Sequence, residues 1–481
     1  MRPAAAEGGG GGAAGGGARG ESISRNAPCP CGSGRRYKAC CGAAGAAAPA
    51  ARAEEPALGS LMTRALALQQ AGRLAEAAAL YRAALAREPN LPDAVHMLGA
   101  IELETGDYAA ALRHLHRAAT LFEWKLPAAR HNLGLAVAAI LANGDRPELA
   151  RLWEAYDRRR DAAPPPGIAA RPRVSVIVPS YNHERYVEGA LESVFRQTYA
   201  NLELVVVDDG STDGSVARIR DALRKSPFPV RFVARANRGA APTINEAVAL
   251  SGGDFVNVLN SDDRFAPTRI AAMVAAVALA GARWGFSRAG LIDETGAVVP
   301  AGASARAADL EYRSDDVAAC DTVGMAFLAG NPAVSTGALF VERALFDRLG
   351  GFADLRYNHD WDFCLRASLV EEPVFVPSPE YEYRLHAANT ILESASAAKR
   401  EADAMFTRFY RHALDLVAAE NPFAPIPALW GARFFERALV AGHAALLPDD
   451  VLRDLADRAL ATADPVDDDA ATTGVSAGAH P

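Results

Sequence analysis

Three stretches of the chain differ in how hydrophobic and polar positions alternate. In residues 58–160, small and aliphatic side chains recur at helical spacing, which predicts an all-α region. Short β-branched runs at 174–178, 202–207 and 254–259 are separated by helix-like segments, which predicts βαβ units and a mostly parallel sheet. Amphipathic helix returns in residues 396–460. We therefore predict a multidomain chain with a helical region, an α/β domain and C-terminal helices.

The ends of the chain and one internal segment have a different composition. Residues 1–24 are nearly all Gly and Ala, and residues 461–481 are acidic and rich in small side chains. Both stretches have too few apolar side chains to bury a core, so we predict that they are disordered. A run of prolines and a glycine at 164–167 breaks the helical pattern and marks a domain boundary.

A repeat of 34 residues runs through the helical region. Small residues recur at this spacing in the pairs Gly72 and Gly106, Ala77 and Ala111, and Ala84 and Ala118. This period, with small side chains where two helices cross, is the signature of tetratricopeptide repeats. We predict two complete repeats and a third that is degenerate or capping; an Ala-rich bundle with accidental spacing is the alternative. Stacked repeats bind peptides or proteins on a concave surface, so we expect a protein partner, with a structural spacer as the alternative.

The overall composition narrows the class of protein. The 481 residues carry a formal net charge of −8; 50% are hydrophobic and 22% are charged, which is typical of a soluble globular protein. An acidic chain lacks the basic face of a general nucleic-acid binder. The longest apolar stretches, such as 271–280, are about half the length that spans a bilayer. No signal pattern begins the sequence. We therefore expect a cytoplasmic protein without a transmembrane segment.

Four of the six cysteines are clustered, as Cys29, Cys31, Cys40 and Cys41. Two close pairs of thiolates can complete a tetrahedron around zinc, and metal binding would supply most of the folding energy of so small a segment. Residues 25–42 closely resemble the SEC-C zinc motif. The resemblance implies a structural Zn²⁺ with all four positions filled and a role in binding proteins. Free or redox-active cysteines are the alternative.

A polar cluster follows each of the three β-branched runs, at residues 179–182, 208–211 and 260–263. Ligands bind at the carboxyl ends of the strands in parallel α/β sheets, so we expect several carboxylates in one crevice. This concentration of negative charge needs a divalent cation or a cationic group of the substrate. Hard oxygen ligands suit Mg²⁺ or Mn²⁺, and such an ion can bridge a diphosphate and stabilise it as a leaving group.

Residues 173–395 resemble a family 2 glycosyltransferase of the GT-A fold. The resemblance rests on motifs in their usual order, at residues 176–182, 193–199, 206–215, 237–239, 260–263, 359–362 and 383–386. It implies a Rossmann-like domain that binds a nucleotide-sugar. The donor-binding positions that it implies are Pro179, Tyr181, Asp208, Asp209, Asn237, Arg238 and Asp262. In the same resemblance, Asp209 would accept a hydrogen bond from a uracil N–H.

The resemblance also implies a metal site. Asp262 and Asp263 correspond to the acidic pair of the DxD type, with Asp263 as the metal ligand and Asp262 as the contact to ribose or sugar. His386 would be a further metal or diphosphate contact, and the ion would be Mg²⁺ or Mn²⁺. Asn260 stands where many members of the family carry another Asp, but its side-chain oxygen still allows metal binding.

Inverting transfer needs a base, because the attacking hydroxyl loses its proton as it forms a bond to the anomeric carbon. The resemblance assigns this role to Asp360, although His359 replaces the Glu that is usual in the family. It further implies that Gly337, Trp361 and Arg384 line the acceptor and sugar pocket.

These features predict an inverting, metal-dependent glycosyltransferase that moves a sugar from a nucleotide-diphosphate donor, expected to be UDP-linked, to an acceptor hydroxyl. The repeats and the zinc motif suggest that the acceptor or a delivery partner is a protein. Synthesis of a polysaccharide or lipid-linked glycan is the alternative within this class. A catalytically weak scaffold that only binds the nucleotide-sugar is the alternative outside it. The amphipathic segment 429–447 would pack on the catalytic domain or touch the inner face of the membrane.

Overall fold

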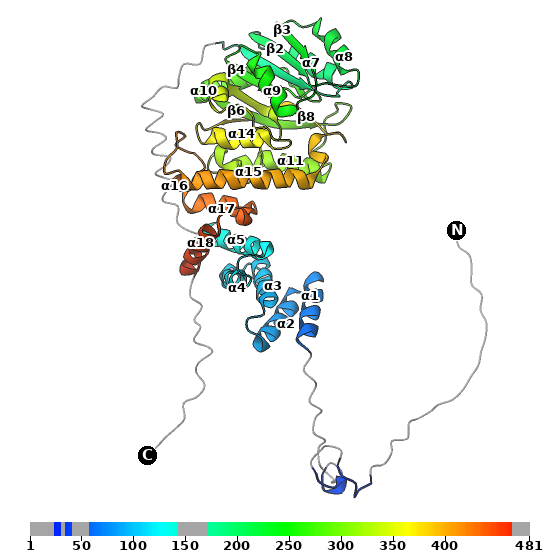
Figure 1. Ribbon diagram of the computed structural model, residues 1–481, viewed down its shortest axis with the longest axis vertical. Helices are drawn as coiled ribbons and strands as arrows, with labels where there is room; N and C mark the ends of the chain where they lie inside the picture. Colours follow the sequence, from blue (N-terminus) through cyan, green and yellow to red (C-terminus); the bar gives the residue numbers. More distant parts are fainter. Residues whose placement is uncertain (1–23, 30–33, 41–56, 143–170, 464–481) are drawn as a thin grey trace, which may run out of the picture. The chain divides into compact units, whose positions relative to one another are not determined.

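The structure, a computed structural model, describes residues 24–29, 34–40, 57–142 and 171–463 (Figure 1). The chain forms two compact units, Met1–Ser60 and Leu61–Pro481. Apart from residue 24 and residues 461–463, the two ends that we predicted to be disordered lie outside the described residues.

The described part of the first unit comprises residues 24–29, residues 34–40 with the short 3-10 helix η1 (Tyr37–Ala39), and the first residues of α1. The backbone N–H of Cys29 joins the first two of these segments with a hydrogen bond of 2.8 Å. Cys29 is buried, and Cys40 directly follows η1. Cys31 and Cys41 lie outside the described residues, so the zinc site stays a prediction.

The second unit begins with helices joined by short turns. They are α1 (Leu58–Gln70), α2 (Leu74–Arg87), α3 (Pro92–Glu104), α4 (Tyr108–Leu121) and α5 (Pro127–Ala142). The turns at Gly72 and Gly106 have positive φ angles of 72° and 84°, which glycine adopts without strain. A Cβ added at Gly99 would lie 2.8 Å from Leu115 Cγ, so a small residue is needed where α3 and α4 cross. The tetratricopeptide assignment stays a prediction, and residues 143–160 of that region lie outside the described part.

The α/β domain is built on a sheet of eight strands, counted over the described residues, in the order β3-β2-β1-β4-β7-β6-β8-β5. The strands are β1 (Val174–Ser180), β2 (Leu202–Asp208), β3 (Val230–Ala234), β4 (Phe255–Val258), β5 (Arg264–Phe265), β6 (Trp284–Ile292), β7 (Leu339–Glu342) and β8 (Val374–Arg384). β1, β2 and β4 are almost completely buried, which explains their continuous apolar runs.

The sheet is mixed, whereas the sequence predicted a mostly parallel one. β1 to β4 pair in parallel, and so do β6 and β8. β7 is antiparallel to both of its neighbours, β4 and β6, and β5 is antiparallel to β8. β5 and β7 are only two and four residues long. Strands this short leave no periodic pattern from which their direction could be predicted.

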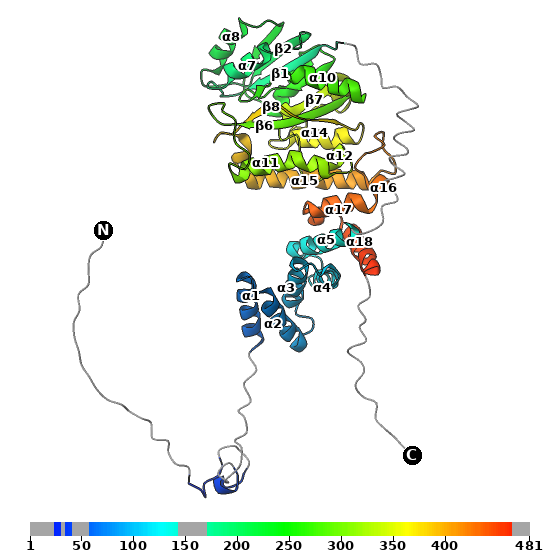
Figure 2. The same cartoon turned by 180° about the vertical axis from the view of Figure 1, so that it is seen from behind.

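Helices surround this sheet and extend beyond it (Figures 1 and 2). Those between the strands are α7 (Val187–Phe195), α8 (Ser215–Leu223), α9 (Ala240–Ala249), α10 (Arg269–Ala280), α11 (Ala305–Asp315), η2 (Asp316–Ala319), α12 (Val323–Ala326), η3 (Thr336–Ala338), α13 (Arg343–Arg348) and α14 (His359–Ser368). Those after β8 are η4 (Thr390–Leu392), α15 (Ala395–Asp415), α16 (Pro427–Trp430), α17 (Ala432–Val440), η5 (His443–Ala445) and α18 (Asp449–Thr462). Both views place α14 between the sheet and α15.

The last helices pack on helix α5. The Arg130 guanidinium on α5 donates to the carbonyls of Ala444 and Leu447, at 3.2 and 3.0 Å. Phe434 and Leu439 on α17 are fully buried. The sequence led us to expect that this segment packs on the catalytic domain or touches a membrane, and the structure adds α5 as its packing partner. Among the helices of the described residues, none is long and apolar enough to span a bilayer.

Candidate active site

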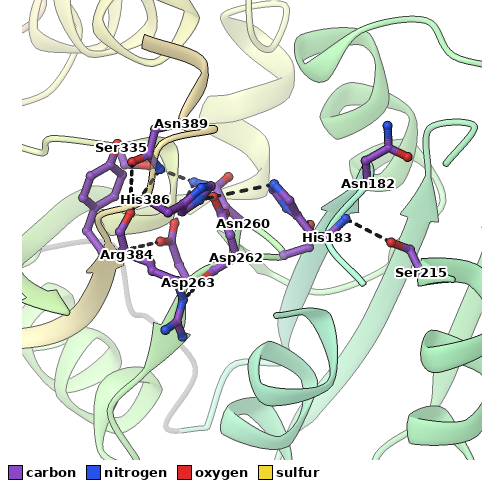
Figure 3. Close-up of polar contacts among 12 residues, drawn as sticks. Asn182, His183, Ser215, Asn260, Asp262, Asp263, Ser335, Arg384, His386 and Asn389 are labelled. Carbon is purple, nitrogen blue, oxygen red and sulfur yellow. Dashed lines mark hydrogen bonds and ion pairs between the residues drawn. The ribbon is translucent and has the colours of Figure 1, made fainter. Parts of the chain in front are cut away.

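The loops after β1 and β2 are joined at the carboxyl edge of the sheet (Figure 3). The Thr212 N–H donates to Asn182 Oδ1 at 2.8 Å, and the Asn182 N–H donates to Ser211 Oγ at 2.9 Å. Asn182 has a positive φ of 53°, which Asn tolerates better than most residues. The next N–H, that of His183, donates to Ser215 Oγ at 3.0 Å. These bonds fix the path of the chain between β1 and α7.

The two predicted carboxylates after β2 have different partners. Asp208 accepts hydrogen bonds from the N–H and the hydroxyl of Ser211, at 2.9 and 2.6 Å. Asp209 accepts from the Arg235 guanidinium and from the backbone N–H groups of residues 238–239, at 2.8 and 2.9 Å. Both carboxylates are buried. Asp208 therefore closes its own turn, and Asp209 joins that turn to the loop after β3.

Other residues predicted to bind the donor are found at the same loops. Tyr181 is 47% exposed, and Pro179 is half-buried near the end of β1. Asn237 and Arg238 are exposed in the loop after β3. Gly210 has a φ of 79°, and a Cβ added there would lie 2.7 Å from the backbone nitrogen of Asn237. The structure thus brings the β2 and β3 loops into contact.

Three side chains form a group of potential metal ligands, which we call the metal-ligand cluster: His183, Asp262 and His386 (Figure 3). The nearest oxygen of Asp262 lies 2.9 Å from His386 Nε2 and 3.8 Å from His183 Nε2. Burial opposes ionisation of Asp262, but the hydrogen bond from His386 and the charges of both histidines lower its pKa below the usual value. The carboxylate form, which is the form that binds metals, is therefore favoured.

The cluster fits a divalent cation. Its three ligand atoms lie within 4.8 Å of one another, and imidazole nitrogen and carboxylate oxygen are both ligands of first-row divalent ions. Sequence reasoning predicted His386 but missed His183. The available signal was the position of His183 directly after the motif that ends β1, at the same sheet edge as the acidic pair.

Asp263, which the sequence predicts as the metal ligand of the acidic pair, has hydrogen-bond partners of its own. Its carboxyl accepts hydrogen bonds from the Tyr381 hydroxyl, from Asn260 Nδ2 at 3.1 Å and from the Arg384 N–H at 2.8 Å. Burial and the neighbouring charge of Asp262 raise the pKa of Asp263 well above its usual value. This side chain ties the β4 loop to β8, and Asp262 takes the place at the metal-ligand cluster.

The predicted base, Asp360, lies in the first turn of α14. One of its oxygens accepts from Asn331 Nδ2 at 3.1 Å, and the other accepts from the Trp361 N–H at 2.8 Å. Burial raises the pKa of Asp360 above its usual value, although the His359 charge and the two hydrogen bonds oppose this shift. The carboxylate is therefore a stronger proton acceptor than an exposed Asp.

The first turn of η3, with Ser335 and Thr336, links the β4 loop to α14. Asn260 Nδ2 donates to Ser335 Oγ at 2.8 Å, and Thr336 Oγ1 lies 3.1 Å from His359 Nε2. His359 Nδ1 is buried without a hydrogen-bond partner among the described residues. The departures that the sequence showed from the family pattern, Asn260 and His359, thus contact the same short turn.

Two residues predicted to line the acceptor and sugar pocket contact aromatic and backbone groups of the fold. A Cβ added at Gly337 would collide with the Tyr381 ring, so this glycine provides room for a buried aromatic side chain. Trp361 donates through Nε1 to the Phe327 carbonyl at 2.8 Å, and its ring packs edge to face on Phe406 of α15 at 5.0 Å. Trp361 therefore joins α14 to α15.

Arg384, the third predicted pocket residue, is buried beneath the metal-ligand cluster. Its Nε donates to the Asp262 carbonyl at 2.6 Å, and its Nη1 donates to the Asp293 carbonyl at 2.9 Å. The guanidinium also lies over the Tyr186 ring, 5.0 Å from the centroid. Its donors therefore hold the backbone of the β4 loop and of the loop after β6. The sequence motif predicted that Arg384 lies at the site, but it could not predict the direction of the Arg384 side chain.

Two segments of the chain match known family models. Residues 175–283 match the model of glycosyl transferase family 2, and residues 25–43 match the SEC-C motif. The chain thus contains a segment of the family 2 glycosyltransferase type, which covers β1 to β4 and the acidic pair, and a separate SEC-C segment.

Individual relatives are similar over part of their length. An uncharacterized glycosyltransferase of Nostoc sp. is 35% identical over 102 residues, which are 21% of this chain and 32% of that protein. Glycosyltransferase GlyG of Streptococcus pneumoniae is 38% identical over 91 residues, which are 19% of this chain and 30% of that protein. The chain therefore spans about a third of the length of these curated relatives.

Among solved structures, the mannosyltransferase PcManGT of Pyrobaculum calidifontis, in complex with GDP-Man and Mn²⁺, is similar with a TM-score of 0.42. The two chains are 22% identical, and the similarity covers 69% of this chain and 86% of that one.

Proposed function

We propose that the chain is a glycosyltransferase that moves a sugar from a nucleotide-diphosphate donor to an acceptor hydroxyl. The family match of residues 175–283 supports this activity. The observation that carries the proposal is that the β1 and β4 loops bring a metal-ligand cluster to the carboxyl edge of the sheet, beside the β2 and β3 loops. Ligands bind at this edge in α/β proteins.

Tyr181 and Asp209 would hold the nucleotide. An ionised carboxylate offers about four acceptor positions. Asp209 uses three of them, for Arg235 and for the two N–H groups of residues 238–239. One position remains for the ring N–H of a uracil, which supports a UDP-linked donor. The exposed ring of Tyr181 offers a stacking surface for the base.

His183, Asp262 and His386 would hold the divalent cation. When bound, such an ion supplies the positive charge that stabilises a diphosphate leaving group. The chain itself keeps the three side chains directed at one point, because Arg384 holds the Asp262 backbone and Asn389 accepts the His386 N–H at 2.9 Å.

Asp360 would take the proton from the acceptor hydroxyl as it attacks the anomeric carbon, which inverts the configuration of that carbon. The raised pKa of its buried carboxyl supports this role, because a base works best when its pKa approaches the working pH. Asp360 comes from α14, an element separate from the metal-ligand cluster, as in-line attack from the far side of the sugar requires.

The acceptor that we favour is a protein. The SEC-C match and the predicted repeats in α1 to α5 support this choice, because stacked helical repeats bind polypeptides. The alternative acceptor is a polysaccharide or a lipid-linked glycan. A screen of acceptors distinguishes it from a protein. We also propose that the protein is intracellular, because clustered thiols usually serve as metal ligands in reducing compartments.

The test is a donor screen with the full-length protein. Binding and nucleotide release are measured for UDP-, GDP- and dTDP-sugars, with and without Mn²⁺. We expect slow, metal-dependent release from one donor, with the UDP-sugars favoured. Binding without release from any donor would support the scaffold alternative, and absence of binding to every donor would contradict the proposal.

A further inference from the structure

The positions of the three cluster side chains match a shared ion. Ligand atoms that each lie about 2.1 Å from one ion are about 3.0 Å apart when at right angles and about 4.2 Å apart when opposite. The distances from the Asp262 oxygen to His386 Nε2 and His183 Nε2, 2.9 and 3.8 Å, fall in or near this range. All three atoms lie within 4.8 Å of one another, so small side-chain rotations suffice for joint ligation.

His183 is oriented as a ligand by contacts that do not involve the cluster. Its Nδ1 lies 2.8 Å from Ser261 Oγ, which leaves Nε2 directed at Asp262. The backbone N–H of His183 is held by Ser215 Oγ, and its ring packs edge to face on Tyr186, 6.2 Å between centroids. Metal-binding histidines usually have their second nitrogen fixed by such a partner.

His386 is fixed from another side. Its N–H donates to Asn389 Oδ1, and the same oxygen accepts from Arg306 Nη2 at 3.1 Å. Asn389 Nδ2 in turn donates to the Arg384 carbonyl at 3.1 Å. The three cluster side chains therefore come from the β1, β4 and β8 loops, and the partners named here, all within the chain, hold each of them in place.

We infer that His183 is the third protein ligand of this cation site, so that the chain binds a divalent ion before any nucleotide arrives and prefers Mn²⁺ to Mg²⁺. Three protein ligands make the diphosphate unnecessary for initial binding. Mg²⁺ prefers oxygen ligands and keeps its water shell, whereas imidazole nitrogen suits the first-row transition ions. The role of this ion in sugar transfer rests on the proposed function. Binding of the ion to the three side chains can be tested without any transfer reaction.

The experiment is a titration of the full-length protein with Mn²⁺ alone, followed by electron paramagnetic resonance. One equivalent of zinc is added first to fill the four thiolates, and unbound zinc is removed, because excess Zn²⁺ would also occupy the imidazole and carboxylate ligands. We expect the protein to bind one Mn²⁺ at this site in the absence of nucleotide, and pulsed spectra to show modulation from the ligand nitrogens. Mg²⁺ should displace this Mn²⁺ only at much higher concentration. His183→Ala should weaken Mn²⁺ binding at least tenfold and reduce the nitrogen modulation. His412→Ala, which removes an exposed histidine of α15, should change neither.

A second variant keeps a ligand at the position. His183→Asp replaces a nitrogen by oxygen, so we expect it to retain binding and to shift the preference towards Mg²⁺. The inference is overturned if the unmodified protein binds no Mn²⁺ without nucleotide, or if His183→Ala keeps the affinity and the nitrogen modulation. Failure of the donor screen while Mn²⁺ still binds through His183 would refute the proposed function and leave this inference standing.

Discussion

Single carboxylates in this chain differ in role because their neighbours differ. Asp262 has two histidines beside it and a lowered pKa. Asp263, the next residue, is buried against Tyr381 and has a raised pKa. Asp360 is buried with two hydrogen bonds and also has a raised pKa. The charge state of each residue at neutral pH therefore follows from burial and partners, and of these three carboxylates Asp360 is the one that combines a raised pKa with a place outside the β4 loop.

The raised pKa of Asp360 gives a prediction about pH dependence. The base must be deprotonated, so activity is lost as the pH falls through its pKa. We expect the acid limb of the profile of kcat/KM to lie above the ordinary Asp value of about 3.9. Asp360→Asn should remove that limb together with most of the activity. Asp362→Asn, on the same helix, is the control and should keep the limb; a limb at the ordinary value in the unmodified enzyme would contradict the assignment.

Helix α15 holds the turn that leads to the proposed base. Glu401 on α15 accepts the backbone N–H groups of Arg356, Tyr357 and Asn358, each at 2.8 Å, in the turn just before Asp360. Burial opposes ionisation of Glu401, but these hydrogen bonds lower its pKa, so the carboxylate is charged when it holds the turn. Helix α15, through Glu401, thus positions the turn that carries the proposed base, Asp360.

We predict that Glu401→Ala lowers kcat by on the order of tenfold or more, because the turn that carries Asp360 loses its anchor. KM for the donor should change little, since the β1 and β2 loops are not involved. Steady-state kinetics with varied donor separate the two effects. Asp403→Ala is the matched control on the same helix, because its carboxylate pairs with exposed Lys399. A change confined to KM would argue against a positioning role.

The sequence predicted at which edge of the sheet the candidate site lies. It did not predict where several of the side chains at that edge point. The β-branched runs and the polar clusters after them placed Asp208, Asp209 and Asp262 at one edge, because the strands that precede them are parallel. The choice between Asp262 and Asp263 depends on Tyr381, which is more than a hundred residues away in the sequence. The burial of Trp361 likewise depends on Phe406 of α15. Such partners are known only once the chain is folded.

At the scale of the whole second unit, α5 and the C-terminal helices share a packed contact. A Cβ added at Gly134 of α5 would lie 2.7 Å from Ala444 Cβ and 3.1 Å from Leu439 Cδ2. Arg130 of α5 bonds two carbonyls of the C-terminal segment and pairs with Asp449 at 2.7 Å. The C-terminal helices therefore join α5 on one side and, through Tyr410 and His443, α15 on the other.

We predict that Gly134→Ala destabilises the second unit by about 1–3 kcal/mol, because the added methyl group overpacks this contact. Gly189→Ala in α7 is the control within the same unit: nothing lies within 4 Å of the added Cβ, and alanine favours the helix by up to about 1 kcal/mol. Denaturant unfolding of the two variants measures both effects. Equal stability of the two variants would contradict this account of the α5 contact.

The N-terminal segment gives a prediction about the acceptor. Removal of residues 1–57 deletes the SEC-C motif and leaves α1 to α18. We expect donor hydrolysis to be spared, because every described residue of the candidate site remains. Transfer to a protein acceptor should fall. Transfer by the shortened and the full-length chains is measured with the same acceptor. Equal rates would contradict the proposal that this segment recruits the acceptor.

The central claim is tested most directly by comparing the unmodified chain with Asp360→Asn on the donor that it binds best. Donor affinity and Mn²⁺-dependent nucleotide release are measured for both proteins. The account predicts equal affinity and a loss of release of about 10²–10⁴-fold in the variant, which is the usual contribution of a general base. Full activity in the variant, or release that does not depend on the metal, would contradict it.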